Sequence, residues 1–370
     1  MSVRFNRKLE SIPGYTPGAP AGKGAVEVAA SDLVQLASNE SPWAPLPEVV
    51  EAVGSALSSM NRYPDPTGAE LRGAIAERHE VDPASVALAN GSCEILLAAG
   101  EALLEPGAEV VYSWPAFSIY PMLAPLSGAR EIRVPLAEGE VHDLGAMAAE
   151  VTAATQLVLV CNPNNPTGTY RTCSEIAQFL DQVPDHVTVI LDEAYIDFQQ
   201  FDDPEDTVEL LAGHPNLVLL RTFSKSHSLA GFRIGYALGS PAFRAAVEAV
   251  RQPFSINAPA QVAANESLRH QDKIAERIEG LIIERVRVLG ALAEMGLEAT
   301  ESQANFAWVS LGEDGPAIEA DVVAQLKEAE VLVRPGSLLG GPGWLRITFG
   351  TRDEDDRMLT ALARSLGIDS

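Results

Sequence analysis

Short, almost wholly apolar segments alternate with helical patterns through the first two thirds of this chain. The predicted strands cover 85–90, 109–114, 130–136, 156–162, 187–195, 216–223 and 233–239. Helical patterns occur between several of them and before the first, at 47–57, 68–79, 91–104 and 173–183. Strands that are apolar on both faces are typical of a mostly parallel sheet covered by helices on both sides. We therefore expect an α/β fold.

The two ends of the chain differ from this pattern. Residues 1–29 are rich in Gly, Pro and Ala and predict an extended arm. After residue 257 we expect one long charged helix from about 259 to 296, and then a smaller α+β unit. Its predicted elements are strands at 304–311, 331–336 and 344–350, a helix near 316–330 and a last helix. We expect three parts, namely an arm (1–29), a large domain (30–257) and a small domain (258–370).

Charge and composition exclude several kinds of partner. A net charge of −25 repels nucleic-acid phosphates. No apolar run approaches the ~18 residues that a membrane span needs, and we expect neither a membrane segment nor a secretory signal. The cysteines Cys93, Cys161 and Cys173 form no CxxC pair, which predicts a reducing, cytoplasmic location. The histidines lack metal-ligand spacing, so we expect no metal.

Polar groups follow five of the predicted strands. They are residues 90–92, Trp114, 162–168, 192–195 and 222–225. In a doubly wound sheet, ligands bind beyond the carboxyl ends of the strands, so we expect these groups to share one site.

Several of these residue types suit a phosphate. Ser92, which we expect to be the N-cap of the helix over 91–104, would present free N–H groups and the positive end of the helix dipole. Thr222 and Ser224 add hydroxyls, and Arg233 adds a guanidinium. Taken singly, Ser92 is also compatible with an ordinary cap and Arg233 with a surface charge.

A second group of residues suits a pyridine ring. Asp192 ends an apolar run, and a buried carboxylate there needs a cationic partner such as a protonated pyridine nitrogen. Tyr195 and Asn165 could hydrogen-bond a phenolate oxygen of the same ring. Lys225, desolvated beside cations, could stay neutral enough to form an imine. Together with the phosphate groups, these residues predict a pyridoxal 5′-phosphate site.

The segments "CNPNNPTG", "LDEAYIDF", "TFSKSHSLAGFRIGY" and "WLRITFGT" resemble the signatures of class I/II aminotransferases. With "LASNESPWAPLP", "NRYPDP" and "PAFSIYP", the chain resembles the histidinol-phosphate aminotransferase family along nearly its whole length. The resemblance implies the fold of fold type I pyridoxal-phosphate transferases. That fold has a large domain, with a mostly parallel sheet between helices, and a smaller α+β domain.

The resemblance also implies a role for each cofactor-site residue. Lys225 would form the imine and carry the proton, Asp192 would keep the pyridine nitrogen protonated, and Asn165 and Tyr195 would bind the ring oxygen. Phe117 would stack on the ring face. The phosphate would be held by Ser92, Cys93, Thr222, Ser224 and Arg233. Many family members carry aspartate where Cys93 stands, and Cys93 is also compatible with a small buried hydrophobe.

Two further implications concern the partner chain and the substrate. Tyr63 in "NRYPD" matches the tyrosine that reaches the phosphate of the other subunit's cofactor, which implies a homodimer with shared active sites. Arg346 matches the arginine that binds the acidic end of the substrate, with Tyr15, Asn305 and Arg334 as helpers.

The expected function is a ping-pong aminotransferase that acts on a small-molecule amino donor and 2-oxoglutarate. Our main hypothesis is histidinol-phosphate:2-oxoglutarate aminotransferase of histidine biosynthesis, chosen because that activity is prevalent in the family. The alternative is an aromatic amino acid aminotransferase, because "EVVYSWPAF" and "SQANFAWVSLG" resemble aromatic-preferring relatives. A decarboxylase of a phosphorylated amino acid shares these motifs, and release of carbon dioxide would distinguish it.

Other classes lack their sequence features in this chain. A dinucleotide dehydrogenase needs G-x-G-x-x-G and a serine hydrolase needs G-x-S-x-G, and neither spacing occurs. A cofactor-binding regulator would need a basic DNA-binding segment, for which the charge and length leave no room.

Overall fold

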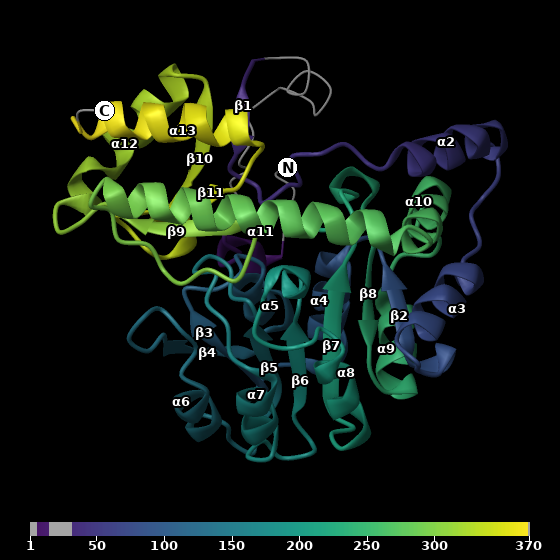
Figure 1. The fold of residues 1–370 in the computed structure, drawn as a ribbon. Helices are drawn as coiled ribbons and strands as arrows, with labels where there is room; N and C mark the ends of the chain where they lie inside the picture. The colour runs from purple at the N-terminus through teal and green to yellow at the C-terminus, as the bar shows by residue number, and fades with distance from the viewer. Residues whose placement is uncertain (1–5, 15–31, 369–370) are drawn as a thin grey trace, which may run out of the picture.

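A seven-stranded sheet forms the centre of the larger part of the molecule (Figure 1). The computed structural model describes residues 6–14 and 32–368. The strand order is β2-β8-β7-β6-β5-β3-β4. Its strands are β2 (Val86–Ala89), β3 (Glu109–Trp114), β4 (Arg130–Pro135), β5 (Thr155–Cys161), β6 (Thr188–Asp192), β7 (Leu217–Thr222) and β8 (Gly235–Leu238). All neighbours pair in parallel except β8, which runs antiparallel to β2 and β7. The predicted α/β fold with a mostly parallel sheet is confirmed.

Helices cover both faces of this sheet, because successive side chains of each strand point to opposite sides. In β5, Val158 and Val160 belong to one core cluster, and Leu157 and Leu159 belong to the other. The first cluster packs against α2 (Pro47–Ala56), α3 (Ala69–Arg78), α6 (Leu144–Ala149), α7 (Cys173–Leu180), α8 (Asp206–Glu209) and α10 (Ala258–Leu268). The second packs against α4 (Ser92–Leu103), α5 (Tyr120–Ser127) and α9 (Pro241–Val250).

A smaller four-stranded sheet has the order β1-β10-β11-β9. Its strands are β1 (Val34–Leu36), β9 (Phe306–Ser310), β10 (Val331–Pro335) and β11 (Trp344–Thr348). They share a core with α11 (Gln271–Glu294), α12 (Gly315–Glu328) and α13 (Arg352–Ser365). The long helix α11 runs across the top of the large sheet in Figure 1 and links the two sheets.

Strand β1 was not predicted, since three residues are too few to show a period. It pairs in parallel with β10. A segment from the range 30–257 therefore contributes a strand to the smaller sheet. The division of the chain into an arm and two domains otherwise stays a prediction.

Two helix boundaries differ from the sequence-based expectation. The single helix expected from 259 to 296 is two helices, α10 and α11, separated at Arg269 and His270. Their N–H groups bond to carbonyls three residues back, which tightens and ends α10 without any Gly or Pro to signal the break. Ser92 is not the N-cap of α4: Gly91 is, at φ +80° and ψ 162°, and Ser92 is the first helical residue. Glycine alone adopts that backbone conformation easily.

No helix within the described residues is long and apolar enough to cross a membrane. Within the same residues, no three His, Cys, Asp or Glu side chains gather as a metal site would require.

Candidate active site

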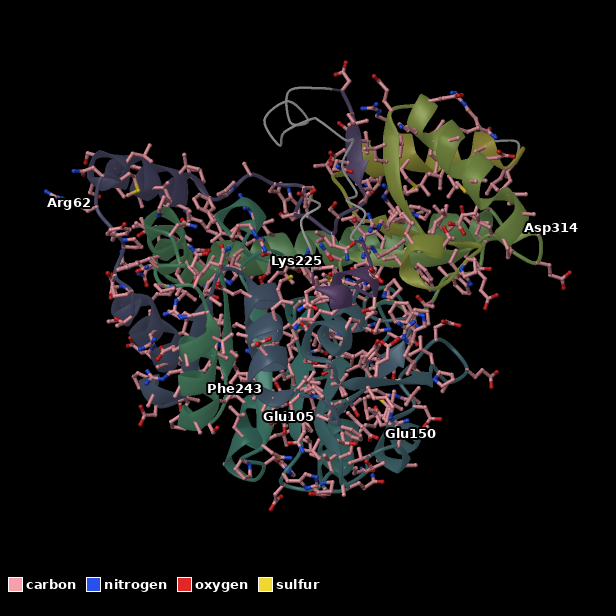
Figure 2. All side chains as sticks on the ribbon, turned by 180° about the vertical axis from the view of Figure 1, so that it is seen from behind. Arg62, Glu105, Glu150, Lys225, Phe243 and Asp314 are labelled. Atoms are coloured by element: carbon pink, nitrogen blue, oxygen red, sulfur yellow. The ribbon has the colours of Figure 1, made fainter. Side chains whose placement is uncertain are left out.

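A cavity of about 380 Å³ lies at the carboxyl ends of the large sheet's strands, where residues of the smaller sheet also reach it. Figure 2, seen from behind, shows Lys225 between the large sheet and the smaller unit. The predicted site residues that line this cavity are Ser92, Cys93, Phe117, Asn165, Asp192, Tyr195, Thr222, Ser224, Lys225, Arg233, Arg334 and Arg346. Four of the five expected strand ends therefore contribute lining residues, and Trp114, at the end of β3, does not.

Lys225 lies in the loop directly after β7. Its Nζ donates to the carbonyl oxygens of Asn39, at 2.8 Å, and Ser38, at 3.3 Å. Burial of the side chain and the nearby Arg346 guanidinium lower the pKa of Lys225 to about 8. An amine with this pKa is partly neutral near physiological pH, which suits a nucleophile and a proton carrier.

Asp192 is the last residue of β6 and is only 2% exposed. Tyr120 Oη donates to its Oδ2 at 3.0 Å, and the Ala194 N–H donates to its Oδ1 at 3.3 Å. Burial raises the pKa of Asp192 to about 6. Within the described residues Asp192 has no ion-pair partner at salt-bridge distance. A cationic ligand nitrogen in the cavity would therefore stabilise the carboxylate.

Tyr195 and Asn165 form a connected polar wall. The Tyr195 hydroxyl accepts from Asn39 Nδ2 at 2.9 Å and from Asn165 Nδ2 at 3.2 Å. Burial holds the pKa of Tyr195 well above its usual range, so the phenol keeps its proton to donate. Asn165 Oδ1 accepts from Arg346 Nη1 at 2.7 Å, and Ala37 O accepts from Arg346 Nη2 at 2.7 Å. The wall thus couples the position of Arg346 to that of Tyr195.

The first turn of α4 and Arg233 form an anion cradle. A side chain at Gly91 would meet Arg233 Nη2 at 2.6 Å, and one at Gly235 would meet the Ser92 backbone nitrogen at 2.5 Å. Only glycines allow the guanidinium and the helix N-terminus to approach so closely. Together they concentrate N–H donors and positive charge.

Two hydroxyl residues and a thiol complete the cradle. Thr222 Oγ1 donates to Ser224 Oγ at 2.9 Å. Burial raises the pKa of the Cys93 thiol, so Cys93 adds no negative charge that would oppose a phosphate.

Two predicted residues, Tyr63 and Asn305, are not among those that line this cavity. Tyr63 is 82% exposed and stacks on Phe254, with ring centroids 4.6 Å apart. Asn305 is buried, and its Nδ2 donates to the carbonyl of Asn39, a cavity-lining residue, at 3.2 Å. Tyr15 lies outside the described residues. The roles given to these three residues stay predictions.

Asn39 lines the cavity and Tyr120 contacts Asp192, although no role was predicted for either residue. Asn39, at φ +53°, contacts Lys225 through its carbonyl and Tyr195 through its side chain. Both residues stand inside segments that carried the family resemblance, "LASNESPWAPLP" and "PAFSIYP". That resemblance was the only signal that could have found them.

A lysine with a lowered pKa, a buried carboxylate and an anion cradle at the ends of parallel strands are the features of a pyridoxal-phosphate enzyme of fold type I. The model of the class I and II aminotransferases matches residues 31–362. The chain therefore belongs to the class I and II aminotransferase family.

Similar proteins agree with this assignment. Over 356 residues the chain is 45% identical to an aromatic amino acid aminotransferase of Thermobifida fusca, covering 95% of this chain and 94% of that one. Over 361 residues it is 42% identical to a histidinol-phosphate aminotransferase of Rubrobacter xylanophilus, covering 97% and 100%. The fold matches the crystal structure of histidinol-phosphate aminotransferase from Sinorhizobium meliloti in complex with pyridoxal 5′-phosphate, with a TM-score of 0.88, 28% identity and coverage of 99% and 98%.

The cofactor of this family is pyridoxal 5′-phosphate. When bound, it supplies an electron sink for bond breaking at the amino-bearing carbon of the substrate. The residues present fit its charges. The α4 N-terminus and Arg233 would hold the phosphate, Asp192 would face the ring nitrogen, and Tyr195 with Asn165 would hold the ring oxygen.

Proposed function

We propose that this protein transfers the amino group of an aromatic amino acid to 2-oxoglutarate, which yields an aromatic 2-oxo acid and glutamate. The choice of donor rests on one observation. Over nearly its whole length, the chain is 45% identical to the aromatic amino acid aminotransferase of Thermobifida fusca and 41% identical to that of Streptomyces avermitilis. These relatives favour the alternative of the sequence analysis over its main hypothesis.

The composition of the cavity wall supports this donor class. Arg334 and Arg346 are buried partners on adjacent strands and bring two positive charges to one side of the cavity. A guanidinium pairs well with the carboxylate that both an amino acid and 2-oxoglutarate carry. Phe117 and Leu339 add apolar wall, against which an aromatic side chain gains free energy by burial.

Histidinol phosphate is the second candidate donor, favoured by the 42% identity to the Rubrobacter xylanophilus enzyme. Its phosphate would occupy the position of the carboxylate near Arg346, with Arg334 as a second donor. The two candidates therefore differ in which anion the arginines bind and in which ring the apolar wall accepts.

A panel of amino donors with 2-oxoglutarate tests the proposal. We expect kcat/KM for phenylalanine and tyrosine to exceed that for histidinol phosphate by at least about 10-fold, which is about 1.4 kcal/mol of transition-state binding. Glutamate and the 2-oxo acid should form in equal amounts. A preference for histidinol phosphate would reject the aromatic assignment, and release of carbon dioxide would reject transamination itself.

We also propose that two copies of this chain form a dimer with shared active sites. Exposed apolar side chains gather around the end of α9. Leu97 and Val250 line a groove of about 290 Å³, and Phe254 follows with Tyr63 stacked on it. A second copy that covers these side chains would remove them from water and bring Tyr63 toward the neighbouring cavity.

Mixing two impaired variants tests the shared site. Tyr63→Ala and Lys225→Ala chains, unfolded and refolded together, should recover about a quarter of wild-type activity. Half of the randomly assorted dimers are mixed, and each mixed dimer keeps one of two sites intact. If Tyr63 acts within its own chain, both sites of the mixed dimer carry a lesion and no activity returns. Each variant refolded alone is the control.

A further inference from the structure

Tyr120 is fully buried and contacts the carboxylate that faces the cavity. It is the first residue of α5, and its hydroxyl donates to Asp192 Oδ2 at 3.0 Å. The other carboxylate oxygen accepts from the Ala194 N–H at 3.3 Å. Within residues 6–14 and 32–368, each oxygen of Asp192 thus accepts from one donor, and the two donors together fix the plane of the carboxylate.

The Tyr120 ring is itself held by two other aromatic rings. Tyr112 meets it edge-on at 5.7 Å between centroids, and Phe117, which lines the cavity, meets it edge-on at 5.9 Å. The orientation of the hydroxyl is therefore determined by packing on the side of α5 that faces the sheet. Tyr120 also connects Phe117, proposed to stack on the cofactor ring, to Asp192, proposed to face its nitrogen.

The charge of Asp192 depends on a balance of neighbours. Burial and the adjacent Glu193 favour the neutral acid, whereas donation from Tyr120 and the positive charge of Lys225 favour the carboxylate. The thiols of Cys161 and Cys93 also interact electrostatically with this carboxyl. A hydrogen bond donated to the charged form of a carboxyl stabilises that form. Because Tyr120 is out of contact with solvent, water cannot replace its hydroxyl without repacking.

We propose that Tyr120 is a positioning residue that keeps Asp192 ionised and oriented toward the ring nitrogen of the cofactor. The proposal rests on the assignment of Asp192 to that nitrogen and does not depend on which amino donor the enzyme uses. Tyr120 touches neither the cofactor nor the substrate in this role, since it acts through Asp192.

Tyr120→Phe tests the role because it keeps the ring and removes only the hydroxyl. Tyr112→Phe is the matched control: its ring is buried in the same cluster, but its hydroxyl donates to Glu131 and not to Asp192. We expect Tyr120→Phe to weaken cofactor binding by about 10-fold, measured by titrating cofactor-free protein, because hydrogen bonds to charged groups contribute more than neutral ones. The cofactor affinity of Tyr112→Phe should stay within about 2-fold of the wild-type affinity.

A second measurement separates positioning from packing. In the holoenzyme, the pH midpoint of the visible absorbance band should shift upward in Tyr120→Phe, because a less positive ring nitrogen withdraws less charge. In an Asp192→Asn background, the same substitution should weaken cofactor binding by less than about 2-fold, because the charge that it supports is gone.

The proposal would be overturned if Tyr120→Phe weakened cofactor binding equally in the wild-type and Asp192→Asn backgrounds. It would also be overturned if Tyr120→Phe had the same cofactor affinity and pH midpoint as Tyr112→Phe. Neither measurement uses an amino donor, so the result is separate from the donor panel.

Discussion

Replacing Lys225 with alanine should lower the rate of transamination by at least about 10³-fold, because a positioned general acid–base alone contributes about 10²–10⁴-fold and the covalent hold on the cofactor is lost as well. The reason lies in the place of the amine, which is held by the carbonyls of Ser38 and Asn39 in the cavity that Arg346 and Asp192 also line. Single-turnover assays at saturating cofactor measure the loss directly.

Two controls define the cause of that loss. Lys225→Arg keeps the positive charge without a usable nucleophile, so it should be as inactive as the alanine variant. Lys273→Ala removes a lysine that pairs with Glu48 on the surface, and its activity should stay near wild type. Borohydride should fix the cofactor to the peptide that contains Lys225 in the wild type only. Activity within about 10-fold of wild type in Lys225→Arg would contradict the role as nucleophile.

The pKa of Lys225 adds a pH dependence to the same prediction. Because burial and Arg346 lower this pKa to about 8, the neutral amine becomes the main form as pH rises through about 8, whereas an exposed lysine would require a higher pH. Cofactor-free protein should therefore take up the cofactor faster as pH rises, with a midpoint near 8. Removing the neighbouring charge in Arg346→Ala should move that midpoint upward.

The second large effect is expected for Asp192→Asn, which should lower kcat by about 10²–10³-fold. Removing one partner of a buried charge pair costs about 3–5 kcal/mol, and an amide cannot balance a positive ring nitrogen. Cofactor binding should be partly retained, since the α4 N-terminus, Thr222, Ser224 and Arg233 are unchanged. Rapid-mixing kinetics on the holoenzyme, with bound cofactor quantified beforehand, separate the two effects.

Asp355→Asn is the matched control for this substitution. Asp355 is also a buried carboxyl, and burial raises its pKa to about 7, but it lies in α13 and accepts from the Gly350 N–H, away from the cavity lining. Its replacement should leave kcat within about 3-fold of wild type. Near-normal turnover in Asp192→Asn would remove this carboxylate from the mechanism.

Much of the large sheet could be predicted because its strands are apolar on both faces, and that pattern is local. Strand β5, with Leu157 to Val160 in a row, is readable as a buried strand without any knowledge of its neighbours. The same local pattern places Asp192 and Thr222 at strand ends. Since parallel strands end on one edge of a sheet, the meeting of these residues with Lys225 followed from the order of elements.

The helix boundaries that were predicted wrongly, and the elements that were not predicted, depend on single backbone conformations or on partners distant in the chain. The start of α4 at Ser92 depends on Gly91 adopting a positive φ, and the break between α10 and α11 depends on two short-range hydrogen bonds. Strand β1 exists because β10, about 300 residues further along the chain, offers it an edge to pair with. Helix α5 was not predicted, because Pro121 and Pro125 lie within it and proline is normally unfavourable in a helix interior.

The sequence by itself therefore determined the α/β class, the edge of the sheet that carries the site and the residue types that bind there. Only the tertiary structure decided how those residues are held. Asn39 contacts Lys225 and Tyr195 from the loop that follows β1. Tyr120 contacts Asp192 from α5, the helix that follows β3 in the chain. Such contacts join residues whose separation along the chain carries no periodic signal. They form because folding buries polar groups that must then find partners, and the partners available are set by packing.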